Sequence, residues 1–361
     1  MTPIDLVTGG CGFIGRHLVD ELLRTGRSVR VLDCGDPYDL PACIDLRRGS
    51  ILDDVALTSA MDGVARIYHL AGIAHLWCPD RRAFARVNTL GTERILAQAP
   101  RGVRVVHCST ETLLAAMQGG SPARGDARPG AERMPGPYTR SKALAERAAL
   151  AAAQAGQDVV IASPAVPIGP GDRNMTPPSA MLSLFLGGTA PAFLDCTLNL
   201  VDVRDAAEGI RLAGERGHAG QRYLLGGETL RLRQLLVRLT QLTGRPMPRV
   251  ALPGGIALAA ATISEWLADH LTGRPPVATR EGVRLALRSA PVDDGRSRRD
   301  LGYRPRPIDE ALALAVAWLA GTAEQDALRH PTPPRPAASP GRRGAAASGE
   351  AGLSGATADQ R

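Results

Sequence analysis

Two side chains one helical turn apart form the pattern in this sequence that is best suited to chemistry. Tyr138 and Lys142 lie in the segment Tyr138-Thr139-Arg140-Ser141-Lys142, and Lys142 is the only lysine among 43 basic residues. A composition that uses arginine almost everywhere indicates that position 142 needs a compact ammonium, because a guanidinium is a broad planar fork. The alternative is a lysine that survived by chance on a solvated helix face.

A predicted helix places these two side chains on one face. Pro137 suits a first helical turn, and residues 143–148 continue with strong helix formers. Residues four apart then project side by side. A neighbouring ammonium favours a phenolate, so the pair predicts a proton shuttle for an alcohol or carbonyl, with Lys142 lowering the pKa of Tyr138. Because Y-x-x-x-K arises by accident in many helices, it needs a cofactor site beside it.

A glycine-rich turn near the N-terminus predicts such a site. The strand-like residues 4–8 are followed by glycines in the order G-G-C-G-F-I-G and then by helical spacing of leucines. Glycine lets the backbone approach a pyrophosphate, which then sits on the helix N-terminus. A second strand-like run ends at Asp33, whose carboxylate accepts hydrogen bonds from ribose hydroxyls and repels a 2′-phosphate. This order predicts NAD rather than NADP; a glycine turn in an unrelated α/β protein is the alternative.

Later segments continue the alternation of strands and helices. Residues 103–108 form a buried strand pattern that ends in Ser109 and Thr110, and a helical pattern over 80–98 carries Asn88. Ligands of open parallel sheets bind beyond the carboxyl ends of the strands. The two hydroxyls are therefore expected at the same site as the ligand of the glycine turn.

Taken together, these motifs resemble the extended short-chain dehydrogenases/reductases of the NAD-dependent epimerase/dehydratase type. The likeness covers about residues 3–320. The matching segments are 8–15 (T-G-G-C-G-F-I-G), 69–72 (H-L-A-G), 87–92 (V-N-T-L-G-T), 109–110 (S-T) and 169–172 (G-P-G-D). Within the family, segments 136–142, 163–170, 198–205, 223–228 and 301–307 are most similar to the dihydroflavonol 4-reductase-like branch, which includes the hopanoid-associated sugar epimerases.

The resemblance implies a Rossmann-type doubly wound parallel sheet with a smaller C-terminal substrate-binding lobe, and it implies roles for individual residues. Tyr138 would be the general acid/base, and Lys142 would lower its pKa and hold the nicotinamide ribose. Thr110, helped by Ser109, would hydrogen-bond the substrate oxygen, and Asn88 would support the side of Lys142 through backbone or water. The residues expected to bind NAD are Gly9, Gly12, Phe13, Ile14, Gly15, Asp33, Ser50, Ile51, Leu70, Ala71, Gly72, Tyr138, Lys142, Pro164 and Val166.

Two departures from the family pattern bear on cofactor and substrate. Ser50 stands where many relatives have an Asp that contacts adenine, so that contact is weakened or moved. Residues 196–200 lack the arginine with which nucleotide-sugar enzymes clamp a diphosphate, whose charge would have to be met elsewhere, with Arg173 as a candidate. The sequence therefore favours hydride transfer between NAD(H) and a secondary alcohol or ketone of a sterol-, hopanoid- or polyketide-like substrate.

Two other functions remain open at this point. One is a sugar or nucleotide-sugar epimerase or dehydratase that uses tightly bound NAD and releases no NADH. The other is a non-catalytic NAD-sensing or scaffold protein, against which the retention of Tyr138, Lys142 and Thr110 argues.

Composition restricts the setting and the partners. Six cysteines without C-x-x-C or metal spacing predict reduced thiols in a cytoplasmic protein that binds no metal, and no signal peptide is expected. The net charge of +7 comes from arginines dispersed among acids, which argues against nucleic acid and is compatible with an anionic cofactor or membrane surface. Besides the small-molecule substrate, the resemblance implies a homodimer formed through helices at about residues 80–98 and 137–155.

The predicted domains follow the same patterns. Residues 1–163, with a return segment at 198–217, would form the NAD-binding domain, and residues 164–197 and 218–320 the substrate-binding lobe. Residues 321–361 are rich in Pro, Ala, Gly and Arg and are predicted to be disordered. The apolar segment 253–272 is too short to span a membrane; it is predicted to be a core or lid helix or, alternatively, an interfacial helix that contacts a membrane.

Overall fold

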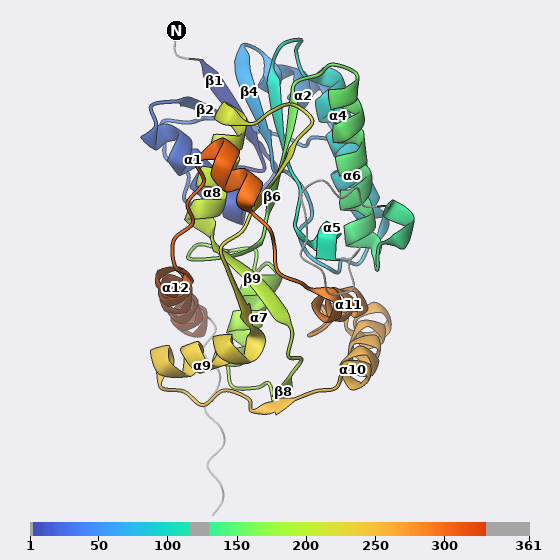
Figure 1. The fold of residues 1–361 in the computed structure, drawn as a ribbon, viewed down its shortest axis with the longest axis vertical. Coiled ribbons are helices and arrows are strands. Elements are labelled where there is room, and N and C mark those ends of the chain that lie inside the picture. Colours follow the sequence, from blue (N-terminus) through green and yellow to red (C-terminus); the bar gives the residue numbers. More distant parts are fainter. Residues whose placement is uncertain (1–2, 116–129, 330–361) are drawn as a thin grey trace, which may run out of the picture. The chain divides into compact units, whose positions relative to one another are not determined.

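Seven parallel strands form the main sheet of this computed structural model, which describes residues 3–115 and 130–329. In sheet order they are β3 (Asp45–Arg48), β2 (Ser28–Asp33), β1 (Ile4–Thr8), β4 (Val64–His69), β5 (Arg104–Cys108), β6 (Val159–Pro164) and β10 (Arg222–Leu225). The order reverses between β1 and β4, and a ligand crevice is expected where it does. The predicted Rossmann-type doubly wound sheet is confirmed (Figure 1).

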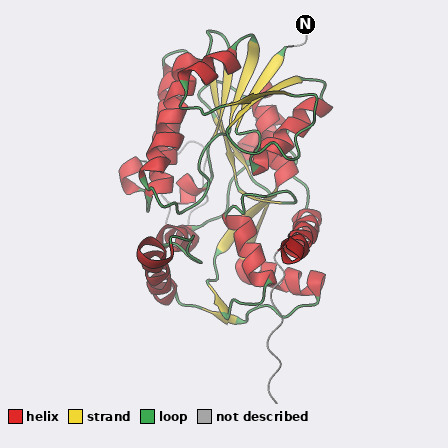
Figure 2. Cartoon of the chain, turned by 180° about the vertical axis from the view of Figure 1, so that it is seen from behind, coloured by secondary structure: helices red, strands yellow, loops and turns green. Residues whose placement is uncertain are grey.

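The central strands are apolar because helices cover both faces of the sheet. Leu6 and Val7 of β1 and Val105 and Val106 of β5 have no exposed surface. The helices on one face are α1 (Phe13–Arg24) and α8 (Val203–Arg216), and the short η4 (Ser297–Leu301) packs on the same face. The helices on the other face are α2 (Asp54–Met61), α4 (Gly91–Gln98) and α6 (Pro137–Gln154). Both views show these two helical layers with the sheet between them (Figures 1 and 2).

Several short elements lie at the carboxyl edge of the sheet, where the ligand crevice is expected. They are α3 (Arg82–Phe84), the π-helical turn η1 (Ala85–Leu90), α5 (Thr112–Ala115) and the 3-10 turn η2 (Ala131–Arg133). A π-helical turn inside a helix commonly marks a functional position, and η1 carries the predicted site residue Asn88.

A second group of elements forms its own apolar core beyond that edge. Its strands are β7 (Val166–Ile168), β9 (Thr197–Asp202) and β11 (Glu228–Arg231) in one small sheet, and β8 (Ala192–Phe193) and β12 (Val250–Ala251) in another. Its helices are α7 (Pro177–Leu186), α9 (Leu232–Thr243), α10 (Gly254–Leu267), the π-helical η3 (Ala268–Thr272), α11 (Arg280–Arg288) and α12 (Ile308–Arg329). The core packs Leu182, Leu200, Leu235 and Leu312 together, all nearly without exposed surface.

The division into two domains stays a prediction. Three elements lie elsewhere than the predicted boundaries placed them. β10, expected in the substrate lobe, pairs with β6, and all four of its residues are buried in the main sheet. β9, expected in the main sheet, pairs with β7 and β11. Helix α12 continues to Arg329, past the expected start of a disordered tail, and residues 330–361 lie outside the described part. Among the described helices, none has the length and apolar character needed to cross a membrane.

Candidate active site

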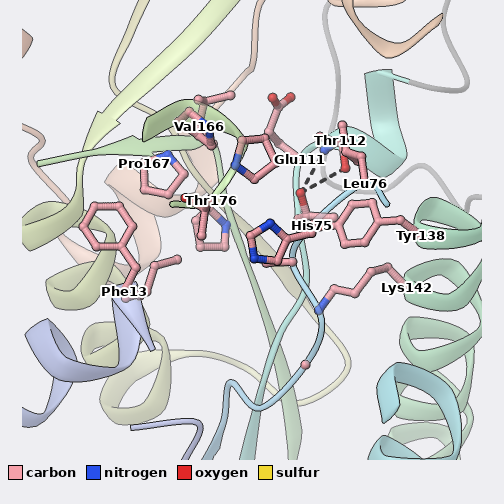
Figure 3. A pocket seen from close by; sticks show the side chains of 18 of the residues that line it. Phe13, His75, Leu76, Glu111, Thr112, Tyr138, Lys142, Val166, Pro167 and Thr176 are labelled. Carbon is pink, nitrogen blue, oxygen red and sulfur yellow. Dashed lines mark hydrogen bonds between the residues drawn. The ribbon is translucent and has the colours of Figure 1, made fainter. Parts of the chain in front are cut away.

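A cavity of about 550 Å³ lies at the carboxyl ends of β1, β4, β5 and β6, where the strand order reverses. Most of the predicted site residues line it: Gly9, Gly12, Phe13, Ile14, Gly15, Leu70, Gly72, Ser109, Thr110, Tyr138, Lys142, Pro164 and Val166. The remaining predicted residues, Asp33, Ser50, Ile51, Ala71 and Asn88, lie outside this lining. Figure 3 shows Phe13 on one side of the cavity and Tyr138 and Lys142 on the other.

The glycine turn packs too closely for side chains at two positions. Gly9 has a φ of +77°, and a Cβ there would lie 2.6 Å from the backbone nitrogen of Ala71. A Cβ on Gly15 would lie 2.0 Å from the carbonyl oxygen of Gly9. Helix α1 starts after Gly12 with no side-chain cap and no acidic residue in its first turn. Its first backbone N–H groups are therefore available to an anion, and the turn fits the pyrophosphate of NAD.

The carboxylate of Asp33 lies at the end of β2, beside the glycine turn. Its Oδ2 accepts a hydrogen bond from the backbone nitrogen of Cys11 at 2.9 Å, and its Oδ1 accepts one from Gly35 at 2.7 Å. A carboxylate oxygen can accept more than one hydrogen bond, so both oxygens can also bind ribose hydroxyls. The position fits the predicted role, whereas the cofactor contacts predicted for Ser50 and Ile51 stay predictions.

Helix α6 carries both residues of the predicted proton shuttle. It begins at Pro137, as predicted, and places Tyr138 and Lys142 in the cavity wall one turn apart. The Tyr138 ring is buried and meets Phe84 edge-on, with ring centroids 6.3 Å apart. The Lys142 ammonium donates a hydrogen bond to the carbonyl oxygen of Cys108 at 2.7 Å, which fixes it at the end of β5.

Burial raises the pKa of the Tyr138 phenol, a hydrogen bond with Thr110 lowers it, and the nearby Glu281 carboxylate raises it. The pKa of Lys142 is lowered by burial. The shift at Tyr138 is opposite in direction to the one predicted from the sequence, because burial of the phenol dominates and the ammonium is bonded to a backbone carbonyl. Tyr138 therefore keeps its proton at neutral pH, which suits donation to a carbonyl oxygen.

A buried carboxylate from α11 caps the N-terminus of the helix that carries Tyr138. Glu281 accepts hydrogen bonds from the backbone nitrogens of Thr139 at 2.8 Å and Tyr138 at 3.3 Å, and from the Thr139 hydroxyl at 2.6 Å. A carboxylate at a helix N-terminus satisfies free N–H groups and complements the helix dipole. Sequence reasoning missed this residue, because more than a hundred residues separate it from the helix it caps.

Ser109 does not contribute its proton to the substrate position as predicted. Its hydroxyl donates to Glu146 on α6 at 2.6 Å, and Glu146 is also paired with Arg222. This buried network ties β5 to α6, and the hydrogen bond to Glu146 occupies the proton of the Ser109 hydroxyl. Thr110, whose hydroxyl lies 3.0 Å from that of Thr112, is left as the hydroxyl beside Tyr138.

Asn88 supports helix α6 rather than Lys142 directly. Its side-chain oxygen accepts a hydrogen bond from the backbone nitrogen of Ile73 at 2.7 Å, and its amide nitrogen donates to the Ser141 hydroxyl at 2.9 Å. The side chain thus joins the loop after β4 to the residue that precedes Lys142. Its effect on the ammonium passes through the position of the helix.

The cavity wall contains a titratable group that the sequence analysis did not predict. Glu111 follows Thr110 and is almost fully buried, and its Oε2 has no hydrogen-bond partner among the described residues. Burial raises the pKa of this carboxyl to about 7, against the effect of a hydrogen bond with Asn199. The Ser-Thr-Glu-Thr sequence contained a signal, since a carboxyl directly after the predicted substrate-binding hydroxyl is placed for acid–base work.

The raised pKa of Glu111 predicts a pH-dependent loss of stability. The folded protein holds this proton to higher pH than the unfolded chain does, so the free energy of unfolding falls as the pH rises from about 4.5 to about 7. Glu111→Gln removes the ionisation. In urea unfolding, we expect the variant to match the parent at pH 4 and to exceed it by up to about 3 kcal/mol at pH 8. If the free energy of unfolding changed with pH in the same way in both proteins, the pKa of Glu111 would not be raised in the folded protein.

Comparison with known proteins shows which family this chain is similar to. Residues 6–226 match the NAD dependent epimerase/dehydratase family. A putative dihydroflavonol 4-reductase of Synechocystis sp. is 38% identical over 329 residues, which cover 88% of this chain and 95% of that protein. Sterol demethylase protein B of Methylococcus capsulatus is 33% identical over 322 residues, covering 87% and 97%. The crystal structure of gox2253 superposes with a TM-score of 0.78 at 32% identity, covering 88% and 98%.

Proposed function

Because this chain belongs to the NAD dependent epimerase/dehydratase family and is an NAD-dependent enzyme, we propose that it transfers a hydride between NAD(H) and a secondary alcohol or ketone of an apolar, polycyclic or isoprenoid-like substrate. Sterol-, hopanoid- and polyketide-like molecules belong to this class. The names of the two relatives, a dihydroflavonol 4-reductase and a sterol demethylase, support a polycyclic substrate.

The character of the cavity wall carries this proposal. Among the described residues that line the cavity, Lys142 is the only lysine or arginine, and its ammonium already has a carbonyl partner. Arg173, the candidate for holding a diphosphate, is bonded to Asp39 at 2.9 Å and lies outside the lining. A nucleotide sugar would leave its two phosphate charges without partners here. The apolar side chains of the wall include Phe13, Ile14, Ile73, Leu76, Val166, Met181, Leu198 and Leu285.

The side chains of the wall divide the work of the reaction. Bound NAD supplies the hydride acceptor, and NADH the hydride donor. Tyr138 donates its phenolic proton to the substrate oxygen in the reducing direction and becomes a phenolate; in the oxidising direction this phenolate takes the proton from the substrate hydroxyl. Thr110 hydrogen-bonds the same oxygen and orients it. Lys142, one helical turn after Tyr138, would hold the nicotinamide ribose, and Glu281 fixes the start of that helix.

Glu111 gives the wall a further group that can donate or accept a proton. Its carboxyl is buried one residue after Thr110, and the pKa raised by burial to about 7 keeps a sizeable fraction protonated at neutral pH. A protonated carboxyl can donate to a second oxygen of the substrate, and a carboxylate can accept from a hydroxyl. This favours substrates that carry a further oxygen near the reacting carbon.

Net formation of NADH tests the proposed reaction. We expect the purified full chain, given NAD and a 3β-hydroxysteroid as a probe of the polycyclic class, to form NADH steadily and to form none with UDP-glucose. Interconversion of UDP-glucose and UDP-galactose without net NADH would instead support the epimerase alternative. NAD binding with no turnover of any alcohol or nucleotide sugar would support a non-catalytic protein.

A further inference from the structure

Helix α10 and the turn η3 expose a continuous apolar stripe. The stripe, called here the α10 face, consists of Ile256, Ala259, Ala260, Ile263, Trp266, Leu267 and Leu271, all exposed. Exposed fractions reach 62% for Ile263 and 68% for Leu271. The spacing of three and four residues keeps these side chains on one side of the helix. Single exposed apolar residues are ordinary, whereas a contiguous patch marks a contact surface.

The solvent side of α10 lacks the charges that a water-facing helix normally carries. From Gly254 to Ser264 the helix contains no charged residue. Glu265, the first, is buried and points to the other side, where it is bonded to Arg280 of α11. That other side also packs Ala257 and Ala261 against Val283. The helix is therefore apolar toward both the protein and the outside.

The charged residues around the α10 face are mostly basic. Exposed arginines stand at positions 249 and 274, before and after the stripe in sequence, whereas those at 280, 284 and 288 lie on α11, which packs against the other side of α10. Of the acids in the same segment, Glu265 and Glu281 are buried, and Asp269 accepts hydrogen bonds from Trp77 and Arg81. An apolar stripe with a basic rim is complementary to an anionic bilayer surface. Trp266, stacked on His270 with centroids 5.1 Å apart, has the amphipathic character of membrane-interface side chains.

The α10 face and the cavity lie on opposite sides of one helix pair. α11 contributes Gly282, Leu285 and Ala286 to the cavity wall, and Val283 on its other side packs against α10 (Figure 1). This helix pair therefore separates the α10 face from the cavity. A bilayer is the medium in which a sterol- or hopanoid-like molecule resides.

We propose that the α10 face docks on the surface of an anionic membrane and that the apolar substrate enters the cavity from the lipid. Docking stands on the exposed stripe and its basic rim, whereas the entry of substrate rests on the proposed function. The helix lies in the interface and does not cross the bilayer, since it presents only one side to lipid.

Vesicle flotation of the full chain tests docking without any turnover. We expect binding to vesicles of phosphatidylcholine mixed with phosphatidylglycerol, weaker binding to phosphatidylcholine alone, and release by salt. The double variant Ile263→Glu and Leu271→Glu should weaken the binding constant for the vesicles by at least about tenfold, because the loss of one buried aliphatic side chain alone accounts for that much. The control, Val55→Glu, changes a valine on α2 that is still more exposed, at 80%, and should bind like the parent.

Two outcomes would overturn the proposal. Equal vesicle binding by the parent and the double variant would place any membrane contact elsewhere in the chain. A dimer that sedimentation velocity detects in the parent but not in the double variant, together with no vesicle binding, would identify the α10 face as a contact between copies. Either result would leave the proposed redox reaction intact, because NADH formation with a water-soluble alcohol does not depend on the α10 face.

Discussion

Replacing Tyr138 with Phe will reduce turnover by about a hundredfold or more, because the variant loses the proton that moves to or from the substrate oxygen. Binding of NAD should be unchanged, since the aromatic ring keeps its buried place against Phe84. Steady-state rates of ketone reduction give the first quantity, and a fluorescence titration with NADH gives the second. A fall in turnover with intact NADH affinity would separate a chemical role from a structural one.

The matched control for this variant is Tyr303→Phe. Tyr303 is another buried tyrosine, and its hydroxyl donates to the carbonyl oxygen of Gly226 at 2.7 Å; neither residue lines the cavity. We expect this variant to be less stable but to keep its turnover per folded molecule. Equal turnover of parent and Tyr138→Phe would remove the phenol from the mechanism.

The second large effect is expected from Lys142→Arg, although the charge is retained. The Lys142 ammonium fits as a point charge between the cavity and the Cys108 carbonyl, 2.7 Å away. A guanidinium is wider and planar, and displacement of the ribose or of Tyr138 by about 1 Å costs on the order of a hundredfold in rate. Turnover should therefore fall about a hundredfold, and the dissociation constant of NADH should rise.

Arg140→Lys is the control for this exchange on the same helix. Arg140 is exposed on α6, so the reverse substitution should change neither rate nor affinity. If Lys142→Arg had the full activity of the parent, the lone lysine would be an accident of composition, and the argument from its spacing to Tyr138 would lose its support.

The parts of the site that the sequence predicted are those that depend on local pattern. The glycine turn, Asp33 at the end of β2 and the start of α6 at Pro137 all follow from residues within a few positions of each other. The parallel sheet followed from the alternation of apolar runs with amphipathic helices. In each case a short segment carries both the signal and the structure.

The parts that the sequence did not predict depend on contacts between distant segments. Glu281 reaches the start of α6 from α11, and the Ser109 hydroxyl donates its hydrogen bond to Glu146. The pKa of Tyr138 rises instead of falling because burial outweighs the neighbouring charge, and burial is a property of the whole fold. The position of Glu111 directly after Thr110 was a signal in the sequence, but the burial that raises the pKa of its carboxyl depends on the whole fold.

A crystal structure of the protein with NAD bound would test the central claim most directly. We expect the pyrophosphate against the first turn of α1, the adenosine ribose on Asp33, and the nicotinamide ring beside Tyr138, with Lys142 hydrogen-bonded to its ribose. A dinucleotide bound away from this cavity, or a nicotinamide out of reach of the Tyr138 hydroxyl, would contradict the assignment of this wall as the place of hydride transfer.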